Sequence, residues 1–177
     1  MGTDKALLPF GGFSTLTEYQ LRKFETHFEH VYISCKHKSK FNFDAHFIED
    51  DISYHDSSPL IALASVFAAL KCQEIFVISV DTPFFAWEHF AQLYAYHDKG
   101  YAAVIPRSKS GIQPLCGYYR NAVNPFVLKS IQKERYRLSR LLEQVPTMIV
   151  DFEDEGIFTN LNFQEEYQEA LQKGSIG

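Results

Sequence analysis

Asp81 is the residue in this sequence that is best placed to bind a metal ion. It follows the apolar run 75–80 (IFVISV) and precedes Thr82 and Pro83, so that a buried strand would end at its carboxylate. In open parallel sheets, ligands bind just beyond the carboxyl ends of the strands. One carboxylate together with substrate phosphates is the usual way in which proteins hold Mg²⁺. The same pattern also fits an Asx-type turn, in which the aspartate only accepts hydrogen bonds from nearby backbone.

Three other places in the sequence offer polar side chains for the same chemistry. Lys5 lies in a short glycine-containing segment, and its ammonium could act as a point charge for a phosphate or simply be solvated. Asp50 ends another predicted strand within a run of three acids, which a solvated loop would also explain. Asn160 and Asn162 follow the last predicted strand, and Asn162 is also a candidate helix cap.

A basic stretch stands out in this otherwise acidic chain. Its side chains could bind a phosphate or a pterin-type anion through paired hydrogen bonds, and a solvated helix face is the alternative interpretation. The members of this stretch are Lys133, Arg135, Arg137 and Arg140.

Several other kinds of chemistry lack their sequence patterns. The seven histidines form no HExxH or HxH pattern and the three cysteines form no CxxC, which argues against a zinc site. The motifs GxSxG, GxxxxGK[ST] and GxGxxG are also missing from the sequence. Their absence argues against an α/β-hydrolase, a P-loop NTPase and a dinucleotide-dependent dehydrogenase.

The length and charge of the chain narrow the class of protein. A chain of 177 residues suits one domain over 1–177. There are 17 basic and 22 acidic residues, and the net charge of −5 argues against a nucleic-acid partner. No apolar run approaches the roughly 18 residues of a membrane span, and no signal peptide is recognisable. With three unpaired, widely spaced cysteines, we expect a cytoplasmic protein with reduced thiols and no membrane partner.

Two helices carry clear start signals. Thr15 is an expected N-cap with Glu18 reaching back to it, and the apolar periodicity that follows predicts a helix to about residue 30. Ser58 and Pro59 similarly predict the start of an apolar helix over 60–71.

The remaining elements alternate between strand and helix. Strands are predicted at 31–34, 47–50, 75–80, 101–106, 113–119 and 147–152. Helices are predicted at 87–97, 122–132, 138–144 and from Asn162 to about 172. This alternation predicts an α/β fold with a mostly parallel sheet.

Five segments, taken in order, resemble the motifs of one family. They are MGTDKALL at 1–8, IED at 48–50 with SPL at 58–60, VDTPF at 80–84, QPLCG at 113–117, and FTNLNFQEE at 158–166. Together they resemble the molybdenum cofactor guanylyltransferases, the MobA-type nucleotidyltransferases. The resemblance covers the whole chain and implies a Rossmann-like, GT-A-like fold with three α/β/α layers.

The resemblance implies an activity and its participants. It implies transfer of GMP from GTP to Mo-molybdopterin, with release of pyrophosphate and with Mg²⁺ as cofactor. Molybdoenzyme chaperones are possible further partners. Cytidylyl transfer, or a truncated pterin-binding module without catalysis, are the alternatives.

The resemblance also assigns roles to single residues. Lys5 and Asp81 match the catalytic residues, Asp81 as the metal ligand and both as nucleotide contacts. Asp50 matches a residue that binds the GTP moiety, and Ser34 stands where the family often has an asparagine near the base. The pterin side is assigned to Asn160 and Asn162.

The match begins inside the first family motif. The family opens with a buried strand and a glycine-rich LAGG loop, and the sequence begins at the methionine that follows this loop. We therefore expect that the first strand is missing from this chain, and that an in-frame LAGG-type segment lies upstream of Met1. Ser58 is a second departure, because the family has glycine before the matching proline.

Overall fold

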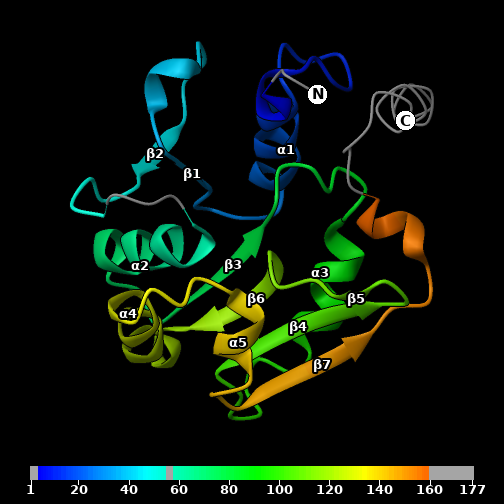
Figure 1. Cartoon of the computed structure of the whole chain (residues 1–177). Coiled ribbons are helices and arrows are strands. Elements are labelled where there is room, and N and C mark those ends of the chain that lie inside the picture. Colours follow the sequence, from blue (N-terminus) through cyan, green and yellow to red (C-terminus); the bar gives the residue numbers. More distant parts are fainter. Residues whose placement is uncertain (1–3, 55–57, 160–177) are drawn as a thin grey trace.

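The computed structural model describes residues 4–54 and 58–159 of the chain, which form two sheets and the helices around them (Figure 1). The smaller sheet is a parallel pair of β1 (Tyr32–Cys35) and β2 (His46–Glu49). The larger sheet has the strand order β3-β6-β4-β5, and β7 also pairs with β4. Its strands are β3 (Glu74–Ile78), β4 (Ala103–Ser108), β5 (Gly111–Ile112), β6 (Cys116–Arg120) and β7 (Thr147–Asp151).

The directions of the main strands agree with the predicted α/β class. β6 is antiparallel to both β3 and β4, so β3 and β4 run the same way, and β7 is parallel to β4. The fold class is confirmed, with β6 as a reversed strand inside the sheet. Gly117 allows this close pairing, because a Cβ there would lie 2.5 Å from Cδ1 of Ile105 and 3.0 Å from the carbonyl oxygen of Val104.

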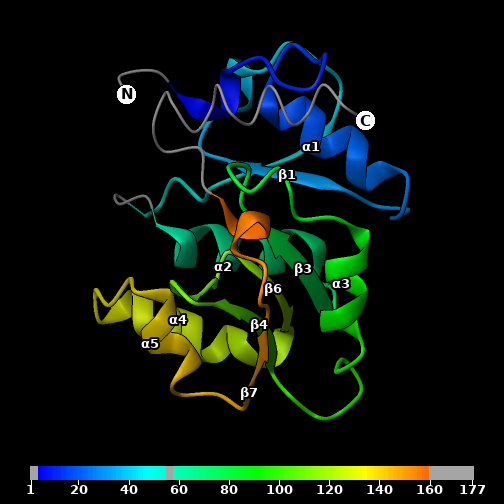
Figure 2. The same cartoon turned by 90° about the vertical axis from the view of Figure 1, so that its right-hand side faces the viewer.

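Helices cover both faces of the larger sheet, which gives the three predicted layers (Figure 2). On one face α2 (Pro59–Leu70), α4 (Asn124–Gln132) and α5 (Leu138–Leu142) pack over a core that includes Leu60, Val127 and Leu141. On the other face α3 (Trp87–Tyr94) and α1 (Leu16–Glu25) bury an aromatic core that includes Phe24, Phe85 and Phe90.

β3 is covered on both faces, as its apolar run predicts. Ile75 and Val77 pack against the core under α2, whereas Phe76 and Ile78 pack against the aromatic core under α3. Glu74 is nevertheless exposed, and the other four side chains of this strand are only half-buried. The reason is that β3 lies at the edge of its sheet, with β6 as its one strand partner in the described part of the chain.

The predicted helix starts are confirmed, and one predicted end is wrong. The Thr15 hydroxyl oxygen accepts a hydrogen bond of 3.0 Å from the Glu18 amide, and the Ser58 hydroxyl oxygen accepts one of 3.3 Å from the Ile61 amide. However, α1 ends at Glu25 and not near residue 30. The amides of residues 27 and 28 both donate to the Phe24 carbonyl, which closes the helix. Phe28 continues the helical spacing in the sequence, but it lies after the end of α1 and packs there on Phe90.

Two further expectations can be compared with the described residues. Cys35, Cys72 and Cys116 are free thiols. Among residues 4–54 and 58–159, no helix has both the length and the apolar character needed to span a bilayer.

Candidate active site

Asp81 lies in the turn that follows β3, and its carboxylate is half-buried. Oδ1 accepts a hydrogen bond of 2.5 Å from the Ser79 hydroxyl. The backbone amide and the hydroxyl of Thr82 both donate to the Ser79 carbonyl, so the turn is closed without the aspartate. Among the described residues, Asp81 thus bonds to a side chain and not to the backbone hydrogen-bond donors that an Asx-type turn would use. Within the described residues, Oδ2 of Asp81 has no hydrogen-bond partner, which leaves it available to a ligand.

The segment 113–117 lies directly beside this turn. The Ser79 amide donates a hydrogen bond of 2.7 Å to the carbonyl of Leu115, at the point where the chain enters β6. Two segments that are more than thirty residues apart in the sequence therefore meet at the end of β3.

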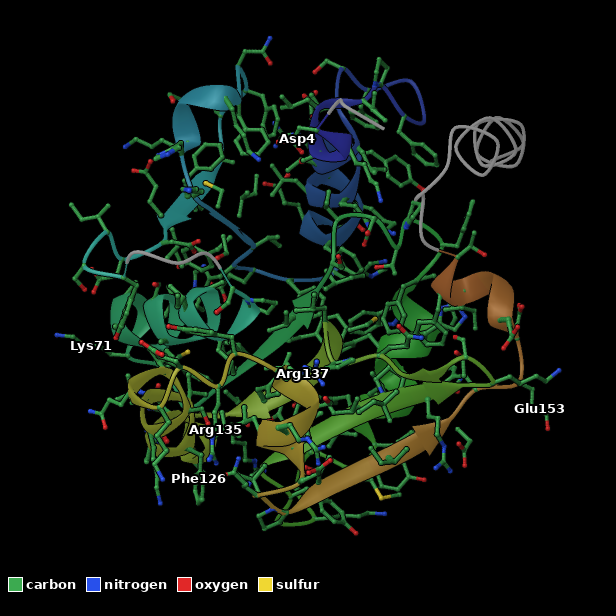
Figure 3. All side chains as sticks on the ribbon, viewed as in Figure 1. Asp4, Lys71, Phe126, Arg135, Arg137 and Glu153 are labelled. Atoms are coloured by element: carbon green, nitrogen blue, oxygen red, sulfur yellow. The ribbon has the colours of Figure 1, made fainter. Side chains whose placement is uncertain are left out.

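Lys5 begins the short 3₁₀ helix η1 (Lys5–Leu7) near the start of the described chain. Asp4 caps this helix through a hydrogen bond of 3.1 Å from the Ala6 amide to Oδ1. Oδ2 of Asp4 also forms an ion pair of 2.9 Å with Lys40, and the hydrogen bond from Lys40 lowers the pKa of the Asp4 carboxyl. Lys40 follows β1, so this ion pair ties the Lys5 segment to the loop beyond the smaller sheet. Figure 3 shows Asp4 beside α1.

α1 supports both the Lys5 segment and the Asp81 turn. The Thr17 hydroxyl donates a hydrogen bond of 2.8 Å to the Ala6 carbonyl, and the Gln20 amide nitrogen donates one of 3.0 Å to the Thr82 carbonyl. Residues three apart on a helix share one face, with Cβ atoms roughly 5–6 Å apart. The neighbours of Lys5 and of Asp81 are therefore anchored within about one turn of the same helix.

Asp50 follows β2, next to the end of β1. Its amide donates a hydrogen bond of 3.0 Å to the Cys35 carbonyl. Oδ1 is buried and has no hydrogen-bond partner. Burial raises the pKa of the Asp50 carboxyl, against the influence of the Lys36 ammonium. A buried polar atom without a partner costs roughly 1–3 kcal/mol, so this oxygen fits a site that a ligand donor completes.

The structure gives little support for a role of the three remaining predicted site residues, Ser34, Asn160 and Asn162. Ser34 is the last but one residue of β1, opposite Ile48, and its side chain is exposed. Asn160 and Asn162 lie outside the described residues.

The residues at the end of β3 fit one kind of metal site. In the described ranges, no group of three or more histidine, cysteine, aspartate or glutamate side chains gathers as a ready-made metal cage. Asp81 offers a single carboxylate oxygen beyond its bond to Ser79. Mg²⁺ suits such a site, because this ion keeps several waters and takes further ligands from substrate phosphates.

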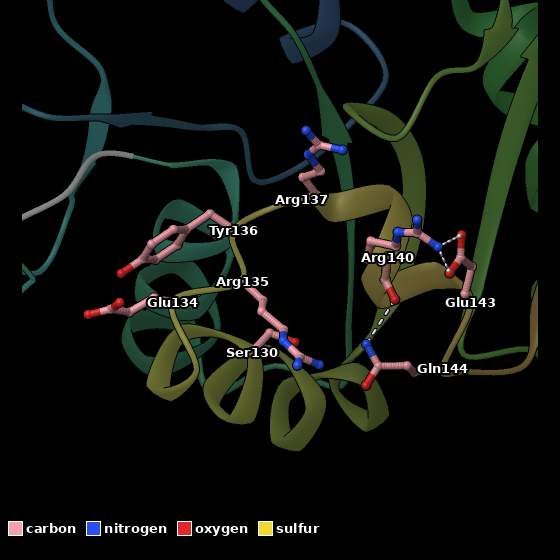
Figure 4. Close-up of a pocket in the computed structure, with 8 residues that line it drawn as sticks. All are labelled: Ser130, Glu134, Arg135, Tyr136, Arg137, Arg140, Glu143 and Gln144. Carbon is pink, nitrogen blue, oxygen red and sulfur yellow. Dashed lines mark hydrogen bonds and ion pairs between the residues drawn. The ribbon is translucent and has the colours of Figure 1, made fainter.

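The three arginines of the basic stretch, but not Lys133, line a cavity of about 720 Å³ between α4 and α5 (Figure 4). Arg140 forms two hydrogen bonds with the Glu143 carboxylate, at 2.8 and 3.1 Å, and is neutralised by it. The guanidinium groups of Arg135 and Arg137 are exposed and take part in no ion pair with a described residue. These two side chains therefore remain available to an anion.

Three residues that contact the Asp81 turn or Asp81 itself were missed by the sequence analysis, namely Gln20, Ser79 and Lys23. Ser79 carries a weak signal, since a hydroxyl two residues before an aspartate at a strand end can reach its carboxylate. Lys23 carries no local signal. Its Nζ donates hydrogen bonds to the carbonyls of Pro83 and Phe85, about sixty residues further along the chain.

Comparison with known proteins gives a consistent result. Residues 1–148 match the family model described as the MobA-like NTP transferase domain. The sequence is 32% identical over 173 residues to a molybdenum cofactor guanylyltransferase of Campylobacter jejuni, covering 98% of this chain and 90% of the relative.

Two solved structures share the fold. Molybdopterin-guanine dinucleotide biosynthesis protein A of Archaeoglobus fulgidus superposes with a TM-score of 0.82 at 21% identity, covering 98% of this chain and 92% of that one. The 2-C-methyl-D-erythritol 4-phosphate cytidylyltransferase of Thermus thermophilus gives a TM-score of 0.75 at 17% identity, covering 99% and 95%. At these identities the likeness concerns the fold alone.

Proposed function

Since the chain belongs to the MobA-like NTP transferase family of nucleotidyltransferases, we propose that it is a molybdenum cofactor guanylyltransferase. It would transfer GMP from GTP to Mo-molybdopterin and release pyrophosphate. The relative from Campylobacter jejuni, which carries this name, supports the choice of substrates.

One structural observation supports the reaction most directly. Asp81 presents a carboxylate at the end of β3, held through Oδ1 by Ser79, with Oδ2 left for a ligand. The Lys5 segment and the Asp81 turn are anchored on the same stretch of α1. A carboxylate for a divalent metal and an ammonium for phosphates are the groups that nucleotidyl transfer requires.

The reaction joins several anions, so alignment and charge neutralisation carry most of the catalysis. An oxygen of the terminal pterin phosphate attacks the α-phosphorus of GTP, and pyrophosphate leaves. Asp81 would hold Mg²⁺, which when bound supplies Lewis-acid stabilisation of the developing phosphate charge. Lys5 would contact the nucleotide phosphates as a point charge. No covalent nucleophile is needed.

The two substrates would meet different residues. We propose that Asp50 accepts hydrogen bonds from the GTP moiety, because its buried Oδ1 has no protein partner. Ser34 would lie near the base. On the pterin side, Asn160 and Asn162 are the candidates from the family resemblance. Arg135 and Arg137, which form no ion pair with a described residue, would offer a further contact for a phosphate. The product would pass to a molybdoenzyme chaperone in the cytoplasm.

A nucleotide panel tests this function. The purified protein is incubated with Mo-molybdopterin, Mg²⁺ and each of GTP, CTP, ATP and UTP, and dinucleotide product and pyrophosphate are measured. We expect product with GTP. Product with CTP alone would identify a cytidylyltransferase, and pterin binding without product from any nucleotide would identify a binding module.

A further inference from the structure

Lys23 is joined to the turn that carries Asp81 by two hydrogen bonds. Its Nζ lies 2.7 Å from the carbonyl oxygen of Pro83 and 2.9 Å from that of Phe85. We propose that Lys23 is a positioning residue for the metal-binding carboxylate: it fixes the chain beyond Asp81 and thereby the place of that side chain. This inference rests on the proposed function, because it assigns Asp81 to the metal.

Gln20 completes the same clamp from one helical turn earlier. Its side-chain nitrogen donates to the Thr82 carbonyl at 3.0 Å and to the Val80 carbonyl at 3.5 Å. Between them, Gln20 and Lys23 bind four carbonyl groups of the segment 80–85. These carbonyls lie beyond the end of β3 and point at one face of α1, so side chains of α1 take the place of a strand partner.

The surroundings of the Lys23 ammonium are mostly apolar, so the presence of a lysine at this position needs a reason. Nζ lies 4.9 Å from the centre of the Phe24 ring and 5.4 Å from that of Tyr19. No carboxylate of a described residue forms an ion pair with it, and burial lowers the pKa of Lys23 to about 8. An apolar side chain of similar length would fill this space without the penalty for burying a charge. The lysine is therefore explained by the carbonyls that it binds.

The clamp also couples the two sides of the site. Thr17, on the same face of α1, holds the Ala6 carbonyl next to Lys5. One rigid helix thus sets the separation between the Lys5 segment and the Asp81 turn. Residues that orient a metal ligand from behind typically change metal affinity or activity by about 10- to 100-fold when they are replaced.

Two readouts on the full chain test the proposal. The variants are Lys23→Met, Lys23→Arg and the exposed control Lys129→Met. Hydrogen exchange of the Thr82 and Phe85 amides reports the order of the turn, with the amides of β4 as the reference for global stability. Mn²⁺ binding in the presence of GTP, followed by electron paramagnetic resonance, reports the metal site without catalysis.

We expect Lys23→Met to speed exchange of the two turn amides relative to β4 and to weaken Mn²⁺ binding about tenfold. Lys23→Arg keeps the charge and the donors, so it should recover most of the exchange protection and most of the Mn²⁺ affinity. Lys129→Met should match the wild type in both measurements. Wild-type exchange and wild-type Mn²⁺ affinity in Lys23→Met would overturn the proposal.

Two further outcomes remain decisive. If Lys23→Met also loses protection in β4, Lys23→Gln is compared, since its amide retains a donor. The clamp predicts turn exchange between that of wild type and Lys23→Met, and exchange equal to the wild type would overturn it. If the wild type binds no Mn²⁺ with GTP, the proposed function fails, and the exchange comparison alone decides whether Lys23 orders the turn.

Discussion

The hydroxyl of Ser79 donates a hydrogen bond of 2.5 Å to Oδ1 of Asp81, across the turn that ends β3. This bond fixes the rotation of the carboxylate and uses only one of its two oxygens. The Ser79 amide is itself held by the Leu115 carbonyl at 2.7 Å. The orientation of the Asp81 carboxylate is therefore set by Ser79, which is itself held by the segment that leads into β6.

Ser79→Ala should weaken the metal dependence of the reaction without destroying it. One lost hydrogen bond to a carboxylate amounts to about 1 kcal/mol, so we expect the Mg²⁺ concentration for half-maximal activity to rise about fivefold. Activity at saturating Mg²⁺ should stay near the wild-type value. Ser79→Thr keeps the hydroxyl and serves as the matched control, and a Mg²⁺ requirement that is the same in all three proteins would contradict the role of this bond.

Lys5→Met should impair use of the nucleotide. Without a point charge for the phosphates, we expect kcat/KM for GTP to fall about 10- to 100-fold. The remaining activity should also depend less on ionic strength, because a screened charge interaction has been removed. Lys109→Met, in the exposed turn between β4 and β5, is the control. The measurement is steady-state kinetics at two salt concentrations. Equal kcat/KM and equal salt dependence in Lys5→Met and Lys109→Met would show that Lys5 does not contact the nucleotide.

Asp50→Asn should make the protein more stable and less active. Burial raises the pKa of the Asp50 carboxyl above its unfolded value of about 3.9. The folded state then binds the proton more tightly, so the stability that this group contributes is present at low pH and is lost as pH rises through the folded pKa. At neutral pH the Asp50 carboxylate is charged, and burying this charge costs stability. The neutral side-chain amide of asparagine removes this cost.

Chemical denaturation at pH 7 and pH 4 checks this stability effect. The gain in unfolding free energy of Asp50→Asn should be largest at pH 7 and should shrink toward pH 4. In kinetics, the asparagine keeps one acceptor oxygen but loses the charge that strengthens the hydrogen bond to GTP, so KM for GTP should rise about 5- to 10-fold. Asp44→Asn, an exposed neighbour, is the control for both measurements. Equal stability and unchanged KM in Asp50→Asn would argue against a ligand site at its buried oxygen.

The sequence predicted those structural features well that depend only on residues close together in the chain. Thr15 and Ser58 cap the two helices as expected, because a cap depends on residues three positions apart. The end of α1 was predicted too late, since Phe28 matches the helical spacing but contacts Phe90 from a turn. The reversed strand β6 between β3 and β4 could not be predicted, because strand order depends on contacts between distant segments.

The candidate site shows the same division. Asp81 could be proposed from its place after an apolar run, and the structure places it at the end of β3. Lys23 and Gln20 could not, because their partners are carbonyls about sixty residues away and carbonyl groups carry no sequence signal. Thr17, which holds the Lys5 segment, also reads as an ordinary helix residue. The sequence therefore revealed Asp81, which ends an apolar run, but it did not reveal the residues that bind the backbone of a distant segment.

The variant Asp81→Asn tests whether Asp81 binds the divalent metal that nucleotidyl transfer needs. The measurement is the rate of dinucleotide formation from GTP and Mo-molybdopterin, across a range of Mg²⁺ concentrations, with the fold checked by circular dichroism. We predict a loss of roughly 100-fold or more that added Mg²⁺ does not restore, since an amide is a poor ligand for this ion. A folded Asp81→Asn protein with wild-type rate and wild-type Mg²⁺ dependence would show that Asp81 does not bind this metal.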